Sequence, residues 1–412
     1  MEKHIVTGGK TPEGLGQALA FLGIRLRFNI RSELFEIGNG NNWQSMNDRN
    51  SQKLRYNIAN TCVIKNGKKY DELLFSKQGF YDCRDALGAD CETDPFTHYL
   101  DELPKSDITE NDIQDYNTTL DHVFDDLFGI EWTPYLSCIT RMMILGAVWR
   151  TYEPGYKIDE VAVIQGPQGA GKDSLVRCLL PDVRYFTDAL GFNLSDKEKI
   201  EVTRGKVFVC ASEMGGVTTT KDLEALKRWI TATEDRVRMA YRRDADDMAR
   251  RFVVVCTTNS DQPLPNDPTG NRRWACISLD SGAHVEPWLE ERRERIWSEA
   301  VAMYRLGIKP NMPREMMLEQ STHNALRRRS DLQIEGALDD AVHDGVPVLM
   351  RDIALQIHLC ETAGEWVRIG KEYQHRLRDA LIARGWKMQR MRHDGSVRNW
   401  WIPPADDKKN EG

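Results

Sequence analysis

Several common features are missing from this 412-residue sequence. No Cys-x-x-Cys pair occurs among its nine scattered cysteines, which argues against a zinc ribbon and indicates buried thiols in a reducing compartment. No apolar signal core opens the chain, and its apolar runs are far shorter than a membrane span, so we expect a cytoplasmic protein. An excess of positive charge is absent as well. Because 56 basic and 63 acidic residues give a net charge of −7, a uniformly basic nucleic-acid coat is excluded and only local basic surfaces remain.

What is present is the composition of a folded protein of two or three domains, with 41% hydrophobic and 29% charged residues. Uninterrupted apolar runs occur at 161–164, 207–211 and 252–256, and helical stretches lie between them. Such runs are typical of strands that are buried on both faces of a parallel sheet. We therefore expect an α/β core over residues 151–285.

The regions on either side of this core predict separate units. Helical periodicity predicts a mainly helical N-terminal domain over residues 1–150 and a helical extension over 286–336. The N-terminal domain also has strand-like pieces, in which residues 34–37 lead into a turn at 38–41. Residues 337–404 predict a helix that stops at Gly385 and is followed by a β-hairpin, and residues 405–412 are expected to fray.

A glycine-rich segment lies between the strand at 161–164 and a helical stretch. Its glycines let backbone N–H groups and the helix N-terminus point at one anion, and Lys172 can reach the β and γ phosphates. The segment predicts a nucleotide site formed by Gly166, Pro167, Gln168, Gly169, Ala170, Gly171, Lys172, Asp173 and Ser174.

The position after the lysine departs from the usual phosphate loop. A Ser or Thr hydroxyl ordinarily ligates Mg²⁺ there, whereas this chain has Asp173 followed by Ser174. Either Asp173 takes the metal, directly or through water, or Ser174 substitutes after a small shift of the loop.

Polar residues follow two of the other predicted strands. Glu213 comes after the strand at 206–211, where a water-activating base is expected beside a phosphate loop. Asn259 follows the strand at 252–256 and can orient the attacking water or contact the γ-phosphate, or it can merely start a turn. Arg272 and Arg273 come after Gly270 and are suited to clamp a phosphate, either of this site or of a neighbouring subunit.

A basic hairpin is expected just before the strand at 252–256. The cations and one aromatic side chain suit a single-stranded DNA backbone and base stacking. A solvated charged hairpin, balanced by three aspartates, is the alternative. The candidate DNA-binding residues are Arg236, Arg238, Tyr241, Arg242 and Arg243.

Taken in order, these segments resemble the virulence-associated protein E family of phage and genomic-island proteins. The resemblance rests on Gly166–Lys172, Ser212-Glu213-Met214, Lys221–Lys227, Asp235–Arg242, Thr257-Thr258-Asn259 and Asp267–Trp274, with Asp94–Lys105 upstream. Asp173 and Ser212 depart from the usual pattern.

The resemblance implies a phosphate-loop (P-loop) NTPase core of the AAA+, superfamily 3 helicase-like type. It implies ATP hydrolysis with Mg²⁺ in a homo-hexameric ring that acts on DNA during replication, with helicase activity. In that arrangement Glu213 activates water, Asn259 senses the γ-phosphate, and Arg272 or Arg273 completes the site across a subunit boundary. The tail resembles a winged helix that contacts duplex DNA. Two other readings stay open: a small-molecule kinase, and a nucleotide-gated DNA-binding or regulatory module without strong hydrolysis.

Overall fold

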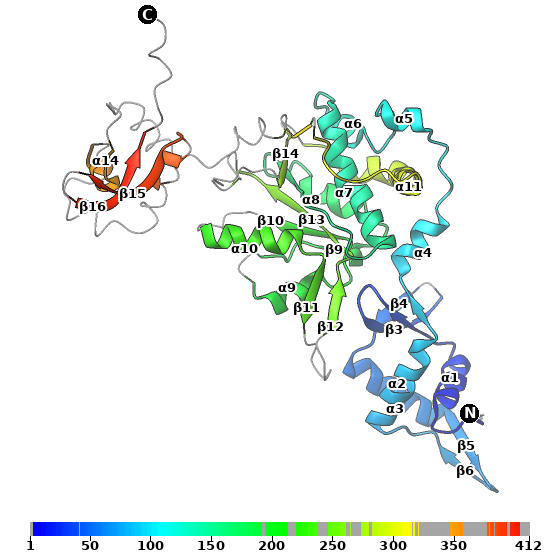
Figure 1. Ribbon diagram of the computed structural model, residues 1–412. Coiled ribbons are helices and arrows are strands. Elements are labelled where there is room, and N and C mark those ends of the chain that lie inside the picture. The colour runs from blue at the N-terminus through cyan, green and yellow to red at the C-terminus, as the bar shows by residue number, and fades with distance from the viewer. Residues whose placement is uncertain are drawn as a thin grey trace, which may run out of the picture.

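The computed structural model describes most of the chain, with gaps. The described residues are 3–40, 42–191, 194–212, 220–237, 246–260, 264, 273–279, 282–314, 316–317, 320, 347–356, 377–378, 380–382, 384–393 and 396–403. They form an N-terminal unit, a central sheet with its helices, and a small C-terminal unit (Figure 1).

The centre of the molecule is a five-stranded sheet whose paired strands all run parallel. The order is β14 (Trp274–Ser278), β8 (Val161–Gln165), β13 (Val253–Thr258), β10 (Phe208–Ser212) and β9 (Phe186–Thr187). All six residues of β13 are buried, as expected for a strand covered on both faces. The predicted parallel sheet is therefore confirmed.

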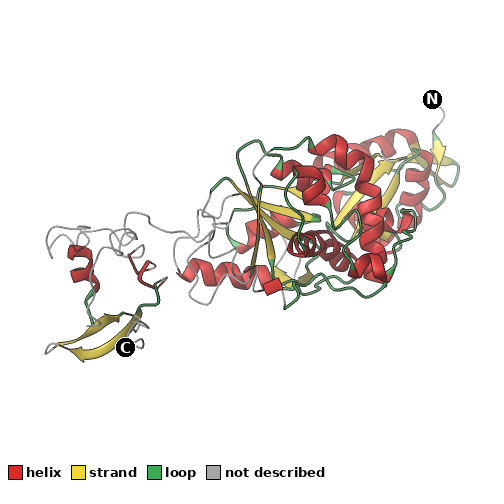
Figure 2. Cartoon of the chain, turned by 90° about the horizontal axis from the view of Figure 1, so that it is seen from above, coloured by secondary structure: helices red, strands yellow, loops and turns green. Residues whose placement is uncertain are grey.

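Helices cover both faces of this sheet (Figure 2). On one face, side chains of β8 and β13 pack with α7 (Pro134–Tyr152), α8 (Lys172–Cys178) and α11 (Val285–Arg305). On the other face, the alternate side chains of the same strands pack with Leu226 and Ile230 of α10 (Thr220–Thr231). Helix α9 (Asp196–Thr203) begins with a capping box between Ser195 and Glu198.

The expected boundary at residue 150 is wrong, because it falls inside α7. A single hydrophobic cluster runs from Phe96 to Met312 and includes α4 (Pro95–Glu102), α6 (Val123–Phe128) and α11. The short helix α5 (Glu110–Gln114) adds Ile113 to it. The helices on both sides of the expected core thus belong to that core. Because α7 is buried on nearly all sides, its sequence lacks the amphipathic pattern that would have shown what it packs against.

The N-terminal unit is mixed rather than mainly helical, which corrects the second expectation for residues 1–150. Its sheets have the orders β4-β3-β2-β7 and β1-β5-β6. The strands are short and carry charged residues between apolar ones, so their pattern is weak. The elements are β1 (His4–Ile5), α1 (Pro12–Phe21), β2 (Arg25–Asn29), β3 (Leu34–Asn39), β4 (Asn42–Ser45), α2 (Asp48–Thr61), β5 (Cys62–Asn66), β6 (Lys69–Glu72), α3 (Lys77–Ala89) and β7 (Glu92–Thr93).

The C-terminal unit contains the predicted hairpin, formed by β15 (Lys387–His393) and β16 (Ser396–Ile402). Helical residues 377–378 and 380–382 precede it, and α14 (Met350–Gln356) packs in the same small apolar cluster with Trp401. Most of the expected extension at 286–336 beyond α11, and the tail at 405–412, lie outside the described residues.

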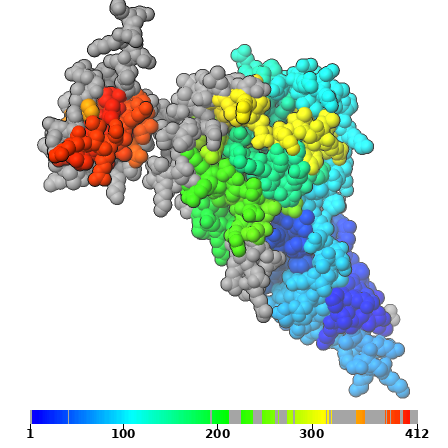
Figure 3. All heavy atoms as spheres, viewed as in Figure 1, coloured from blue at the N-terminus to red at the C-terminus, as the bar shows by residue number. Residues whose placement is uncertain are grey.

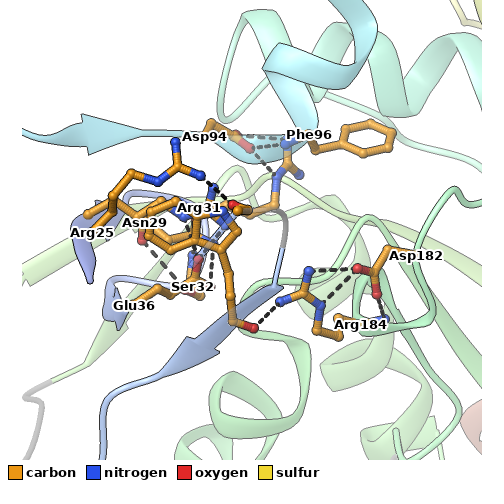
Figure 4. A network of polar contacts seen from close by, with 12 residues as sticks. Arg25, Asn29, Arg31, Ser32, Glu36, Asp94, Phe96, Asp182 and Arg184 are labelled. Atoms are coloured by element: carbon orange, nitrogen blue, oxygen red, sulfur yellow. Dashed lines mark hydrogen bonds and ion pairs between the residues drawn. The ribbon is translucent and has the colours of Figure 1, made fainter. Parts of the chain in front are cut away.

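One buried arginine joins the N-terminal unit to the core (Figure 4). Arg31 donates from Nε to Asp94 Oδ1 at 3.0 Å, and its side chain is fully buried. Its remaining nitrogens donate to the backbone oxygen of Arg251 at 2.8 Å and to Thr151 Oγ1 at 3.0 Å. Asp94 also caps α4 through the backbone N–H of Phe96. Burial by itself would raise the pKa of Asp94, but the charges of Arg31 and Arg251 and the hydrogen bonds hold that pKa below its usual value.

Candidate functional site

The glycine-rich loop connects the carboxyl end of β8 to the first residue of α8, Lys172. Gly169 and Gly171 have φ values of +80° and +90°, a region that side chains rarely adopt. A Cβ on Gly171 would also lie 2.8 Å from Val285 Cγ2, and one on Gly166 would lie 2.9 Å from the Leu279 backbone oxygen. Glycine is therefore required here both by backbone conformation and by close packing.

Lys172 lies under the loop and is 7% exposed. Its ammonium donates to the backbone oxygens of Gly166 at 2.9 Å and Pro167 at 2.8 Å, and to Asn259 Oδ1 at 2.7 Å. Burial lowers the pKa of Lys172, and the nearby Asp173 carboxylate opposes that shift. The lysine is thus held at the centre of the loop by neutral oxygens.

A cavity of about 380 Å³ opens at this edge of the sheet. Because the strands are parallel, the carboxyl ends of β8 and β13 meet there. The structure therefore brings seven of the nine predicted loop residues, from Gln168 to Ser174, to one cavity with Asn259, whereas Gly166 and Pro167 do not line it. Its lining residues are Gln168, Gly169, Ala170, Gly171, Lys172, Asp173, Ser174, Thr257, Thr258 and Asn259.

The two lining threonines, Thr257 and Thr258, belong to β13, which extends two residues beyond the expected strand at 252–256. Thr257 is 4% exposed and its Oγ1 lies 3.4 Å from the thiol of Cys210 on β10. That thiol donates to Asp173 Oδ1 at 3.5 Å. Burial, the largest effect, raises the pKa of Cys210 to about 12, so the group stays a neutral donor. The sequence did not indicate that Cys210 is a neighbour of the loop, and it gave Thr257 no role at the site.

Asp173 and Ser174 both line the cavity, so either can present an oxygen there. Among the described residues, no group of three or more His, Cys, Asp and Glu side chains is arranged to hold a metal ion. Mg²⁺ fits a site with one carboxylate, because it usually keeps several waters and takes its other ligands from nucleotide phosphates. The donors at the cavity therefore suit a magnesium–nucleotide complex better than a metal held by protein alone.

Arg273 lies at the amino-terminal end of the parallel strands, and the glycine loop lies at their carboxyl-terminal end. Its backbone oxygen accepts from Val161 N at 2.7 Å, at the amino end of β8. The five residues of β8 span about 16 Å, and the loop follows the far end of that strand. Arg273 is thus not brought to the cavity of its own chain. Glu213 and Arg272 lie outside the described residues.

The expected pairing of two strands is present as β11 (Glu234–Val237) and β12 (Asp246–Ala249), in which Arg236 is the basic residue. Arg236 is exposed and pairs with Asp247 at 3.5 Å. The base of the hairpin is held by Arg250, which is 2% exposed and donates to Asp235 Oδ2 at 2.8 Å. Arg250 also stacks over Trp229 of α10, 4.6 Å from the ring centroid.

This anchoring role of Arg250 was not apparent from the sequence, in which it resembles any other basic residue. The remaining candidates of the hairpin lie outside the described residues. They are Arg238, Tyr241, Arg242 and Arg243.

Comparison with protein families agrees with the order of these elements. Residues 109–329, more than half of the chain, match the virulence-associated protein E-like domain. The chain belongs to this family. The matched range begins just before α5 and includes α7, the glycine loop and all five strands of the central sheet.

Solved structures similar to this virulence-associated protein E-like chain include three of the NrS-1 C-terminal region. The apo A form has a sequence identity of 12% and a TM-score of 0.45. The apo A form of residues 305–718 has a sequence identity of 13% and a TM-score of 0.45. A further apo structure of residues 305–718 has a sequence identity of 16% and a TM-score of 0.42. Each comparison covers 96% of this chain and 100% of the other. Similarity at this level supports no conclusion about chemistry.

No curated protein matches the chain. In the described part of the chain, no helix is long and apolar enough to cross a membrane.

Proposed function

We propose that this chain is a P-loop ATPase of the AAA+, superfamily 3 type, and that it acts as a DNA helicase in the replication of a phage or mobile element. The observation that carries the proposal is the 2.7 Å bond between Lys172 Nζ and Asn259 Oδ1. It joins the first residue of α8 to the residue that follows β13, at the edge where ligands bind in open α/β sheets.

ATP is held in this proposal by the loop residues from Gly166 to Ser174. The backbone N–H groups and the α8 N-terminus favour negative charge, and glycines at 169 and 171 let the chain curl toward the phosphates. Lys172 exchanges its bonds to backbone oxygens and Asn259 for bonds to the β and γ phosphates. Asn259, released from the lysine, is then free to orient the attacking water or to contact the γ-phosphate.

Glu213 accepts the proton of the attacking water. It follows β10, whose carboxyl end lies beside that of β13 at the same edge of the sheet. Asp173 or Ser174 would hold Mg²⁺, which when bound neutralises the charge on the phosphate oxygens. The thiol that Cys210 donates to Asp173 would orient that carboxylate.

Either Arg272 or Arg273 acts on the nucleotide of a neighbouring subunit. Arg273 lies at the amino-terminal end of the strands, opposite the end with the glycine loop, which supports an action between subunits rather than within one chain. Each active site is then completed on assembly into a homo-hexameric ring.

Single-stranded DNA is contacted by the β11–β12 hairpin through Arg236, Arg238, Tyr241, Arg242 and Arg243. Arg250 holds the base of that hairpin against α10 and precedes β13, so the DNA contact and Asn259 are connected through one strand. The C-terminal unit serves as a winged-helix-like contact to duplex DNA.

One observation favours a second function, a nucleotide-gated DNA-binding module without strong hydrolysis. Asp173 places a negative charge beside the phosphates at the position where a hydroxyl group usually ligates the metal. A small-molecule kinase would not need the basic hairpin.

ATP turnover measured with and without single-stranded DNA, alongside light scattering, separates these functions. The motor predicts DNA-stimulated phosphate release from an oligomer. ATP binding without turnover would support the gated module, and phosphoryl transfer to a metabolite would support the kinase.

A further inference from the structure

Helix α2 of the N-terminal unit has a polar face opposite the face that it buries. Its buried residues are Ser51, Leu54, Ile58 and Ala59. Four exposed residues of α2 are separated by four, three and four positions in the sequence. This spacing places them in one stripe along the side of the helix opposite the buried residues. They are Arg49, Lys53, Tyr56 and Asn60.

The chain leaves α2 directly into the β5–β6 hairpin, which projects from the N-terminal unit on the side away from the central sheet (Figures 1 and 3). Its two-residue turn is made by Gly67, with φ +63°, and Lys68. Lys65 is paired directly opposite Tyr70, which is 55% exposed, and Lys69 follows the turn. Every residue from 65 to 72 is exposed.

This segment is positively charged although the whole chain is acidic. Residues 48–72, which form α2 and the whole hairpin, contain six basic and three acidic residues, a net charge of +3 in a chain of net charge −7. Arg55 is used within the fold, since it donates to the Phe75 backbone oxygen. We define the α2–hairpin surface as Arg49, Lys53, Tyr56, Asn60, Lys65, Lys68 and Lys69. Within the described part of the chain, none of these seven side chains has a hydrogen bond or an ion pair.

We propose that the α2–hairpin surface binds duplex DNA, with α2 in the major groove and the hairpin lysines on the phosphates. An α-helix fits the major groove, and the 14 residues of α2 span about 21 Å. Arg and Asn are side chains that pair with base edges there, and exposed Lys suits phosphates. A convex helix without a row of aromatic side chains suits a single strand less well.

This proposal goes beyond the ATPase and does not depend on it, because the surface lies in the N-terminal unit and includes none of the residues of the cavity. It is also separate from the C-terminal hairpin, so the two possible duplex contacts can be altered independently.

The experiment measures binding of the full chain to a labelled duplex of about 20 base pairs, two turns of the double helix, by fluorescence anisotropy over a salt series. The test variants are Arg49→Ala/Lys53→Ala and Lys68→Ala/Lys69→Ala. Each lost phosphate contact reduces the slope of log affinity against log salt by about 0.9, so the hairpin variant should lose about 1.8 and bind about tenfold or more weakly. The helix variant should also weaken discrimination between duplex sequences.

Lys105→Ala/Arg314→Ala is the matched control, since it removes two exposed positive charges elsewhere. It should bind the duplex as the unchanged protein does. Thermal unfolding should be the same in all variants, because the replaced side chains are exposed and make no described contacts. Duplex affinity and salt slope that are unchanged in both test variants would overturn the proposal, as would an equal loss in the control. A surface that serves an acidic protein partner would give the first of these results. DNA-stimulated ATP turnover, measured on the same samples with a single strand, reports on the motor separately.

Discussion

Lys172 and Asn259 are 87 residues apart in the sequence and 2.7 Å apart in the structure. The contact exists because β8 and β13 are parallel neighbours, so the segments that follow them emerge at one edge. A cation that would bind phosphate and an amide that would sense it thus share one cavity. The proposed hydrolysis begins when the nucleotide separates the two groups.

Glu213→Gln should leave ATP binding intact and reduce ATP hydrolysis by about 10²-fold or more, because glutamine cannot accept the proton of the attacking water. Fluorescent-nucleotide titration and phosphate release, measured on the same sample, provide the check. If binding falls together with hydrolysis, Glu213 supports the structure of the site instead.

Arg242→Ala/Arg243→Ala should weaken binding to all single-stranded sequences alike. The slope of log affinity against log salt should fall by about 0.7 for each phosphate contact that is lost. Anisotropy titrations with single strands of different sequence measure both quantities, with Lys105→Ala/Arg314→Ala as the control for charge. A loss confined to one sequence would contradict a backbone contact.

Mixing Lys172→Ala protein with Arg272→Ala or Arg273→Ala protein should restore part of the ATP turnover. Mixed rings contain interfaces at which an intact loop meets an intact arginine, whereas neither parent has one. The measurement is ATP turnover of the mixture against each parent, after both have been shown to assemble. A mixture without activity, or monomers that hydrolyse ATP at the full rate, would place the arginines outside a shared site.

Asp94→Asn should destabilise the protein by about 3 kcal/mol, because it leaves the buried Arg31 guanidinium without its counter-charge. The pKa of Asp94 is held below its usual value, so the stabilisation is present above the pKa of the unfolded chain and is lost as pH falls through the lower folded value. Urea unfolding from about pH 7 to pH 3 should therefore show a smaller acid loss in the variant than in the unchanged protein.

The control for this change is Asp159→Asn, which breaks the exposed pair with Lys157 and should cost at most about 1 kcal/mol. Equal effects of the two substitutions would show that the Arg31–Asp94 pair does not hold the N-terminal unit to the core.

The central sheet and its glycine loop could be predicted from the sequence because their signals are local. Uninterrupted apolar runs marked β8, β10 and β13. The same locality explains what could not be predicted. Arg31 reaches its partners only when distant segments meet, and nothing in its neighbouring residues distinguishes it from a surface arginine.

The domain boundaries failed for a related reason. Helix α7 is apolar and buried on nearly all sides, so its sequence pattern is the same whether it packs in the N-terminal domain or in the core. In the N-terminal unit, the strand-like piece at 34–37 corresponds to β3, whereas β2 was missed because Arg25 and Arg27 interrupt it and leave few apolar positions to show its period.

The most direct test is steady-state ATP turnover by the unchanged protein and by Lys172→Ala, each with saturating single-stranded DNA. We expect DNA-stimulated turnover that falls by about 10²-fold or more in the variant, because the removed ammonium is the loop's proposed side-chain contact to the phosphates. Matching thermal unfolding curves would show that the variant is folded. Equal turnover in the two proteins would contradict the proposed role of Lys172 and of the glycine loop in ATP hydrolysis.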